Sequence, residues 1–256
     1  MNNTLLKIKN LNVEIEGIKI LRNLNLEINR GEVHAIMGPN GSGKSTLSNI
    51  LAGNDGYNIT SGSIEFCDKN LINLPPNERS NLGLFLAFQY PVEIPGVSIM
   101  NFLKTISECS RKTKGLEPLK PSDFLKLVKE KAKILGIEDD DLKRQFNVGF
   151  SGGEKKRNEA LQLLILDPVL SVLDETDSGL DVDALNVVSE GINGIKSPEN
   201  SLLVITHYKK MLEKIQPNKI HILINGKIVF TGGKEVADLI EKNGFEGFQN
   251  NVWKYK

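Results

Sequence analysis

One stretch of the chain has the residue types and the spacing of a loop that binds phosphate. It reads, in order, Gly38, Pro39, Asn40, Gly41, Ser42, Gly43, Lys44 and Ser45, and Thr46 continues the same segment. Glycines let backbone N–H groups turn inward around a phosphate, because no Cβ stands in the way. The Lys44 ammonium can reach the β- and γ-phosphates of a nucleoside triphosphate, and the Ser45 hydroxyl can ligate Mg²⁺. The stretch therefore predicts a triphosphate site.

The residues on either side of this loop support the prediction. Val33–Met37, ahead of the loop, is a short apolar run typical of a buried strand. The run Lys44–Leu51, behind it, is predicted to form a helix whose positive dipole end faces the phosphates. Strand, loop and helix thus follow in the order that the phosphate-binding motif requires.

Two acids follow an apolar run further along the chain. The run Val169–Leu173 predicts a buried strand, and Asp174 and Glu175 come directly after it. In enzymes with a phosphate loop, the first acid at such a strand end holds Mg²⁺, usually through water. The second acid is placed to polarise an attacking water, so we assign Glu175 as the candidate general base.

A second glycine-containing segment lies between the phosphate loop and these acids. Ser151 is a good helix N-cap, and Gly152 and Gly153 after it expose N–H groups at the positive end of the predicted helix. The segment therefore predicts a second anion site. An ordinary helix cap would explain it if it stood alone, but its position between the loop and Asp174 favours a nucleotide contact.

The composition excludes several classes of function. Lys and Arg together number 32 and so do Asp and Glu, so no overall basic field attracts nucleic acid or anionic lipid. No apolar run approaches the roughly 20 residues of a membrane span, and the first residues lack the pattern of a secretory signal or a transit peptide. Cys67 and Cys109 are isolated, which suits a reducing interior and argues against a metal cluster held by this chain alone. We expect no nucleic-acid partner, no direct membrane insertion, and a location in the cytoplasm, or in the plastid stroma if the gene is plastid-encoded.

The apolar pattern divides the chain into an α/β core and a helical insertion. Alternating residues between 6 and 28 predict antiparallel strands, and Leu84–Phe88 predicts a buried one. The period becomes helical between 97 and 145, and the α/β rhythm returns after Phe150. Asn225-Gly226 predicts a hairpin turn between two late strands. His34 and His221 lie in strand-like runs, where we expect packed or surface imidazoles rather than ligating ones.

The order of these motifs resembles that of the ATP-binding cassette (ABC) ATPases over essentially the whole chain. The resemblance implies an α/β ABC ATPase fold: a phosphate-loop core with an antiparallel β subdomain and an inserted helical subdomain. It implies one domain over residues 1–256, with the catalytic core at 1–90 and 160–256 and the helical subdomain at about 91–159. ATP and Mg²⁺ are the implied substrate and cofactor.

The resemblance also assigns roles to residues that would be unremarkable alone. Gln89 matches the glutamine that touches Mg²⁺ and the attacking water, so Ser45, Gln89 and Asp174 form the implied magnesium set. The loop 178–181, ending at Asp181, matches the one that crosses a dimer interface. His207 matches the switch histidine at the γ-phosphate, beside Lys44 and Glu175 in the implied catalytic set.

Three positions depart from the usual pattern of the family. Phe150 and Glu154 flank the Ser-Gly-Gly segment where leucine and glutamine are usual. The position that usually stacks an aromatic ring on adenine falls near Ile15, and no aromatic residue lies nearby. We therefore expect modest ATP affinity and a weak preference for the base.

Three longer segments resemble the SufC family, the ATPases of the SUF iron–sulfur cluster assembly machinery. They span residues 87–98, 149–159 and 174–181. The resemblance implies the scaffold proteins SufB and SufD as partners, docking near 89–98, and a transient homodimer that closes on ATP. The alternative is the ATPase subunit of a membrane transporter, and co-purification with soluble scaffolds or with membranes distinguishes the two. A regulator that does not hydrolyse ATP is disfavoured by the intact Lys44, Asp174, Glu175 and His207.

Overall fold

A computed structural model describes residues 3–249 of the chain. The strands within this range are β1 (Thr4–Ile15), β2 (Ile18–Asn29), β3 (Val33–Met37), β4 (Asn58–Phe66), β5 (Lys69–Asn70), β6 (Leu84–Ala87), β7 (Ile94–Ser98), β8 (Gln145–Phe146), β9 (Leu170–Asp174), β10 (Ser201–Ile205), β11 (Lys219–Ile224) and β12 (Lys227–Gly232). The helices are α1 (Lys44–Ala52), α2 (Pro76–Asn81), α3 (Ile99–Thr113), α4 (Pro121–Ile134), α5 (Gly152–Leu166), α6 (Val182–Asn193), α7 (Lys209–Ile215), α8 (Glu235–Asn243) and α9 (Glu246–Gln249), with a 3₁₀ turn at Asp141–Lys143.

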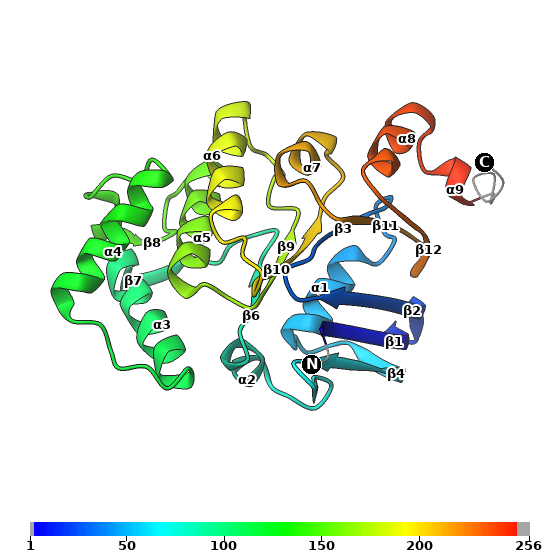
Figure 1. The fold of residues 1–256 in the computed structure, drawn as a ribbon, viewed down its shortest axis with the longest axis horizontal. Coiled ribbons are helices and arrows are strands. Elements are labelled where there is room, and N and C mark those ends of the chain that lie inside the picture. The colour runs from blue at the N-terminus through cyan, green and yellow to red at the C-terminus, as the bar shows by residue number, and fades with distance from the viewer. Residues whose placement is uncertain (1–2, 250–256) are drawn as a thin grey trace.

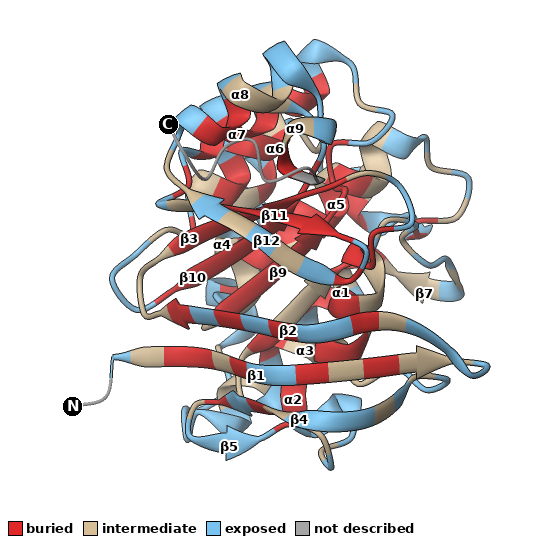
Figure 2. Cartoon of the chain, turned by 90° about the vertical axis from the view of Figure 1, so that its right-hand side faces the viewer, coloured by how far each residue is buried: buried red, intermediate tan, exposed pale blue. Residues whose placement is uncertain are grey.

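A six-stranded sheet forms the centre of the molecule. Its strand order is β12-β11-β3-β10-β9-β6, and every neighbouring pair is parallel except β11 and β12. The residues of β3, β9 and β10 are all buried, as Figure 2 shows by their red colour. Parallel strands covered on both faces read as continuous apolar runs, which is why the sequence identified them.

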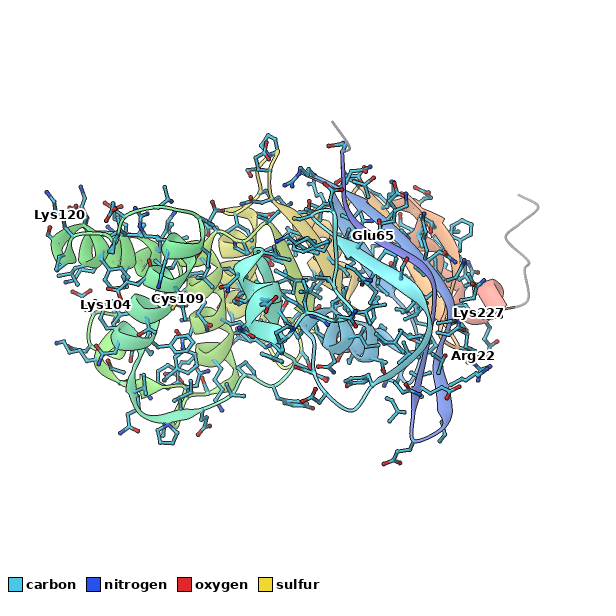
Figure 3. All side chains as sticks on the ribbon, turned by 90° about the horizontal axis from the view of Figure 1, so that it is seen from below. Arg22, Glu65, Lys104, Cys109, Lys120 and Lys227 are labelled. Carbon is cyan, nitrogen blue, oxygen red and sulfur yellow. The ribbon has the colours of Figure 1, made fainter. Side chains whose placement is uncertain are left out.

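A second, antiparallel sheet has the order β2-β1-β4-β5 and packs beside the first. Its strands alternate buried and exposed residues, as expected when one face meets the core and the other meets water. At the opposite end of the molecule, α3 and α4 form a helical arm (Figure 1). The labelled side chains of Figure 3 mark the two ends: Lys104 and Cys109 lie on the arm, and Arg22 and Glu65 lie on the antiparallel sheet.

The predicted elements are found, with two differences, one at a boundary and one an added pair of strands. Helix α5 runs without a break from 152 to 166, so the expected division between residues 159 and 160 falls inside a helix. The helical arm also carries a short two-stranded sheet of β7 and β8, which joins the residues before α3 to those before α5. Asn225 and Gly226, at φ +49° and +77°, form the predicted hairpin turn. Within residues 3–249, no helix is long and apolar enough to cross a membrane.

The two strand histidines are packed against each other in the core, as expected. His221 Nε2 lies 3.0 Å from His34 Nδ1, and Glu32 and Thr231 occupy the outer nitrogens at 2.9 and 2.8 Å. Burial lowers the pKa of His221 to about 3 and also lowers the pKa of His34. Both imidazoles are therefore neutral in the folded protein at pH 7.

This histidine pair predicts a loss of stability in mild acid. Because the pKa of His221 falls from 6.5 to about 3 on folding, its contribution is fully present above pH 6.5 and is lost as the pH falls towards 3. Each extra proton bound by the unfolded chain lowers the free energy of unfolding by about 1.4 kcal/mol per pH unit. Denaturant unfolding at pH 7.5, 6 and 5 measures this slope. A His221→Gln variant should show a shallower slope, and an unchanged one would contradict the assignment.

Candidate nucleotide-binding and hydrolytic site

The carboxyl ends of neighbouring parallel strands bring the predicted residues together. The phosphate loop follows β3, Asp174 ends β9, and His207 follows β10, which lies between those two strands. Gln89 follows β6 at the edge of the sheet. Ligands of open α/β sheets bind outside such strand ends, so the topology itself creates the site.

The phosphate loop has the backbone that its glycines predict. A Cβ on Gly38 would lie 2.1 Å from the carbonyl oxygen of Leu223, so only glycine fits there. Gly43, at φ +104°, precedes the first turn of α1 and lets the loop enter the helix. Lys44 Nζ donates to the carbonyl oxygens of Gly38 and Pro39 at 2.9 and 3.1 Å. The ammonium thus lies across its own loop, and burial lowers its pKa while Glu175 and Asp174 oppose that effect.

A cavity of about 440 Å³ opens above this loop. Its lining combines the loop, the start of α1, one residue of β2 and the residues that follow three other strands: Ile20, Asn40, Gly41, Gly43, Lys44, Ser45, Thr46, Gln89, Glu175 and His207. Nine of these were predicted site residues, and Ile20 is the addition. Its aliphatic side chain, like that of Ile15 at the end of β1, offers no ring for stacking a base.

Glu175 lies where the other catalytic candidates meet. Its Oε2 accepts a hydrogen bond from Gln89 Nε2 at 2.8 Å, and its Oε1 lies 3.7 Å from His207 Nδ1 and 4.0 Å from Lys44 Nζ. Its backbone has φ +47°, a left-handed conformation that is unusual outside glycine and recurs at functional sites. The turn aims the carboxylate into the cavity, where it can accept a proton from a water molecule.

The donor set beside Glu175 suits a hard divalent cation. Ser45 Oγ donates to Asp174 Oδ1 at 3.4 Å, and the Gln89 side chain reaches the same cavity. Burial raises the pKa of Asp174, and the hydrogen bond from Ser45 lowers it. Oxygen ligands from one or two side chains, completed by phosphate and water, are what Mg²⁺ prefers. Ser45, Gln89 and Asp174 would supply such oxygens, so their chemistry suits Mg²⁺, and the magnesium set stays a prediction.

The Ser-Gly-Gly segment lies outside the cavity lining, at the exposed start of α5. Ser151 Oγ accepts the Glu154 N–H at 3.3 Å, and Glu154 Oε2 accepts the Ser151 N–H at 2.8 Å. Glutamine could form the same reciprocal capping box. What favours glutamate here is Arg144, whose guanidinium pairs with the Glu154 carboxylate at 3.1 Å. The Arg144 guanidinium also stacks 4.0 Å above the Phe150 ring, which explains the second departure.

Asp181 is also exposed and does not line the cavity. Its carboxylate accepts the Ala184 N–H at 2.7 Å and caps α6. Asp177, four residues earlier, was not predicted. It accepts a hydrogen bond from Thr206, whose hydroxyl in turn accepts the Tyr208 N–H at 2.9 Å. This buried contact braces the loop that carries His207. The only sign of this role in the sequence is that Asp177 is an acid between Glu175 and Asp181.

Strand β9 contains one buried polar group without a partner. Buried hydroxyl groups are usually hydrogen-bonded. The Ser171 hydroxyl is fully buried, yet it has no hydrogen-bond partner among the described residues.

Comparisons with known proteins agree with this geometry. Residues 21–178 match the family described as ABC transporter. The chain is 52% identical over 252 residues to a probable ATP-dependent transporter, slr0075, of Synechocystis, covering 98% of each chain. It is 49% identical over 241 residues to the probable ATP-dependent transporter SufC of Escherichia coli, covering 94% of this chain and 97% of that one.

Solved structures show the same fold. A dimeric ATP-binding cassette bound to ADP and Pi matches with a TM-score of 0.77 at 22% identity, covering 90% of this chain and 99% of that one. The family match and the relatives agree with the site, which places a phosphate loop, Glu175, a glutamine and a histidine around one cavity, with Asp174 hydrogen-bonded to Ser45 of its lining. The chain therefore belongs to the ABC family of ATPases that hydrolyse ATP, and within it to the SufC-type members.

Proposed function

We propose that hydrolysis uses Glu175 as the general base. Its carboxylate accepts a proton from a water whose oxygen attacks the γ-phosphorus, the β–γ anhydride bond breaks, and ADP leaves with the bonding electron pair. Gln89 and His207, both beside Glu175, orient the water and the γ-phosphate. Lys44 exchanges its two loop carbonyls for β- and γ-phosphate oxygens. Mg²⁺, when bound by Ser45, Gln89 and Asp174, supplies positive charge against the phosphates.

The glycines at the start of α5 support a site shared by two copies of the chain. A Cβ added to Gly152 would meet no atom within 4 Å, and one on Gly153 would meet only the Ala184 Cβ at 3.8 Å. Packing within the chain therefore does not require glycine at either position. Close approach of an external group would require it. We infer that Ser151, Gly152 and Gly153 cover the γ-phosphate bound by Lys44 of a second copy, with Asp181 in the loop that crosses the interface.

The residues directly after Gln89 form an exposed apolar surface that a partner could bind. Tyr90 is 82% exposed and Val92 is 58% exposed, on a segment that Pro91 and Pro95 stiffen. This apolar surface begins directly beside the glutamine that contacts the general base. A partner bound there is therefore coupled to hydrolysis. We propose that the partners are the scaffold proteins SufB and SufD, each holding one copy.

ATP-driven closure of two such copies would move the scaffolds against each other for iron–sulfur cluster assembly, and hydrolysis would reset them. The cluster ligands are assigned to the scaffolds. Among residues 3–249, no group of three or more His, Cys, Asp or Glu side chains is arranged to hold a metal, and Cys67 and Cys109 are free thiols. Assembly of this kind takes place in the cytoplasm, or in the stroma for a plastid-encoded chain.

ATP turnover with and without a purified SufB–SufD complex tests this function. We expect marked stimulation and a complex that co-elutes from a gel-filtration column. A Tyr90→Ser/Val92→Ser variant should lose the stimulation and keep its basal rate. Indifference to the scaffolds, together with recovery of the chain in the membrane fraction, would favour the transporter alternative that the relatives' names also contain.

A further inference from the structure

Helix α5 carries a buried ion pair that the proposed chemistry does not use. Lys156 Nζ lies 3.1 Å from Glu159 Oε2, and the two side chains are only 4% and 6% exposed. Burial raises the pKa of Glu159, and the neighbouring Lys156 opposes that effect. Taking two charges out of water is costly, and replacing a buried ion pair with apolar residues is often neutral or stabilising. The pair therefore needs an explanation in what it contacts.

Both members of the pair hold the backbone of one residue, Phe88. Lys156 Nζ donates to the Phe88 carbonyl oxygen, and Glu159 Oε1 accepts the Phe88 N–H at 2.8 Å. Strand β6 ends at Ala87, so Phe88 has no place in the ladder of the sheet. The ion pair supplies the partners that a neighbouring strand would have supplied.

The residue after Phe88 is Gln89, whose amide donates to Glu175 at 2.8 Å. A short covalent and hydrogen-bonded path thus runs from α5 through Phe88 to the general base. Lys155, also on α5, pairs with Glu93 at 2.7 Å on the other side of the glutamine. Helix α5 therefore holds the chain on both sides of Gln89, at Phe88 and at Glu93.

We propose that Lys156 and Glu159 are positioning residues that fix Gln89 against Glu175 and tie it to the helix carrying Ser151 and Gly152. The proposal rests on the proposed roles of Gln89 and of the α5 glycines. In a closed dimer, the first turn of α5 contacts the partner's nucleotide, and one turn later Lys156 holds the glutamine of its own site. Binding of the partner's nucleotide at the start of α5 then changes the position of Gln89 in the other site, because both are attached to the same helix.

A double-mutant cycle on the basal ATPase of the full chain tests this positioning role. Lys156→Met should lower kcat on the order of ten- to a hundredfold with little change in the KM for ATP, because the glutamine is misplaced while the nucleotide contacts remain. The same change in a Gln89→Ala background should cost nothing further. Lys156→Arg should recover part of the loss.

Two further variants separate positioning from stability. Lys156→Met/Glu159→Gln leaves no unpaired buried charge, and it should fold and show the same loss of kcat. Lys196→Met removes another partly buried lysine that donates to a backbone carbonyl, that of Ile215, and should leave kcat unchanged. Thermal unfolding checks that each variant is folded.

Equal losses of kcat with and without Gln89 would overturn the proposal, as would a folded Lys156→Met/Glu159→Gln variant with full turnover. Unchanged turnover of Gln89→Ala itself would also overturn it, because it would remove the role of the glutamine. None of these measurements uses the scaffold proteins. These measurements are therefore independent of the scaffold experiment. A failure of SufB–SufD to stimulate turnover would contradict the proposed partners, but it would not contradict the positioning of Gln89 by Lys156 and Glu159.

Discussion

Replacement of Glu175 with glutamine should slow ATP turnover about 10²- to 10⁴-fold, the usual contribution of a general base. The glutamine side chain has the same shape and can still accept the hydrogen bond from Gln89, but it cannot take a proton from water. The phosphate loop and Lys44 are unchanged, so ATP should still bind. Because hydrolysis no longer resets the site, an ATP-dependent dimer should accumulate. Single-turnover hydrolysis and gel filtration with ATP measure the two effects.

A matched change far from the site separates this effect from a general loss of charge. Glu65 lies exposed on β4, at the end of the molecule opposite the helical arm (Figure 3). A Glu65→Gln variant should hydrolyse ATP at the wild-type rate. Wild-type turnover in the Glu175 variant would show that another group accepts the proton. Loss of ATP binding would show that the carboxylate holds the nucleotide rather than the water.

The strands around the nucleotide could be predicted because burial on both faces leaves a clear pattern. Runs such as Val33–Met37 are mostly apolar, and residues whose types carry chemistry end or follow these strands. Adjacent parallel strands then place the phosphate loop, Asp174 and His207 at one edge. Sequence spacing and sheet topology together were enough to bring nine predicted residues into one cavity.

The contacts that brace the site could not be predicted, because they join residues far apart in the sequence. Thr206 and Asp177 meet only after β9 and β10 pair, and Lys156 meets Phe88 only after α5 packs beside the end of β6. A lysine-rich helix start is usually a solvated surface, so Lys156 gave no sign of burial. Phe150 and Glu154 likewise depart from the family pattern because Arg144, several residues earlier in the chain, contacts both side chains in the folded protein.

Two inactive variants should restore hydrolysis when mixed. Lys44→Ala removes the lysine from the phosphate loop, and Gly152→Asp places a carboxylate where the partner's γ-phosphate would lie. Each variant alone should have almost no activity, because both sites of its homodimer are defective. A mixed dimer has one site with neither defect, so an equal mixture with random pairing should reach at most about a quarter of the wild-type rate, and less if the defective site slows the intact one through α5.

The Gly152→Asp change suits this test because the chain itself tolerates it. No atom lies within 4 Å of the added Cβ, and an acidic side chain in the first turn of α5 is favourable to the helix dipole. A folded but inactive protein thus reports the missing contact with the partner. The matched control mixes two variants of the same half-site, Gly152→Asp with Ser151→Arg, and should recover nothing. Recovery in the first mixture alone requires that α5 of one copy completes the site of the other. Absence of recovery at every mixing ratio would contradict a shared site with independent turnover.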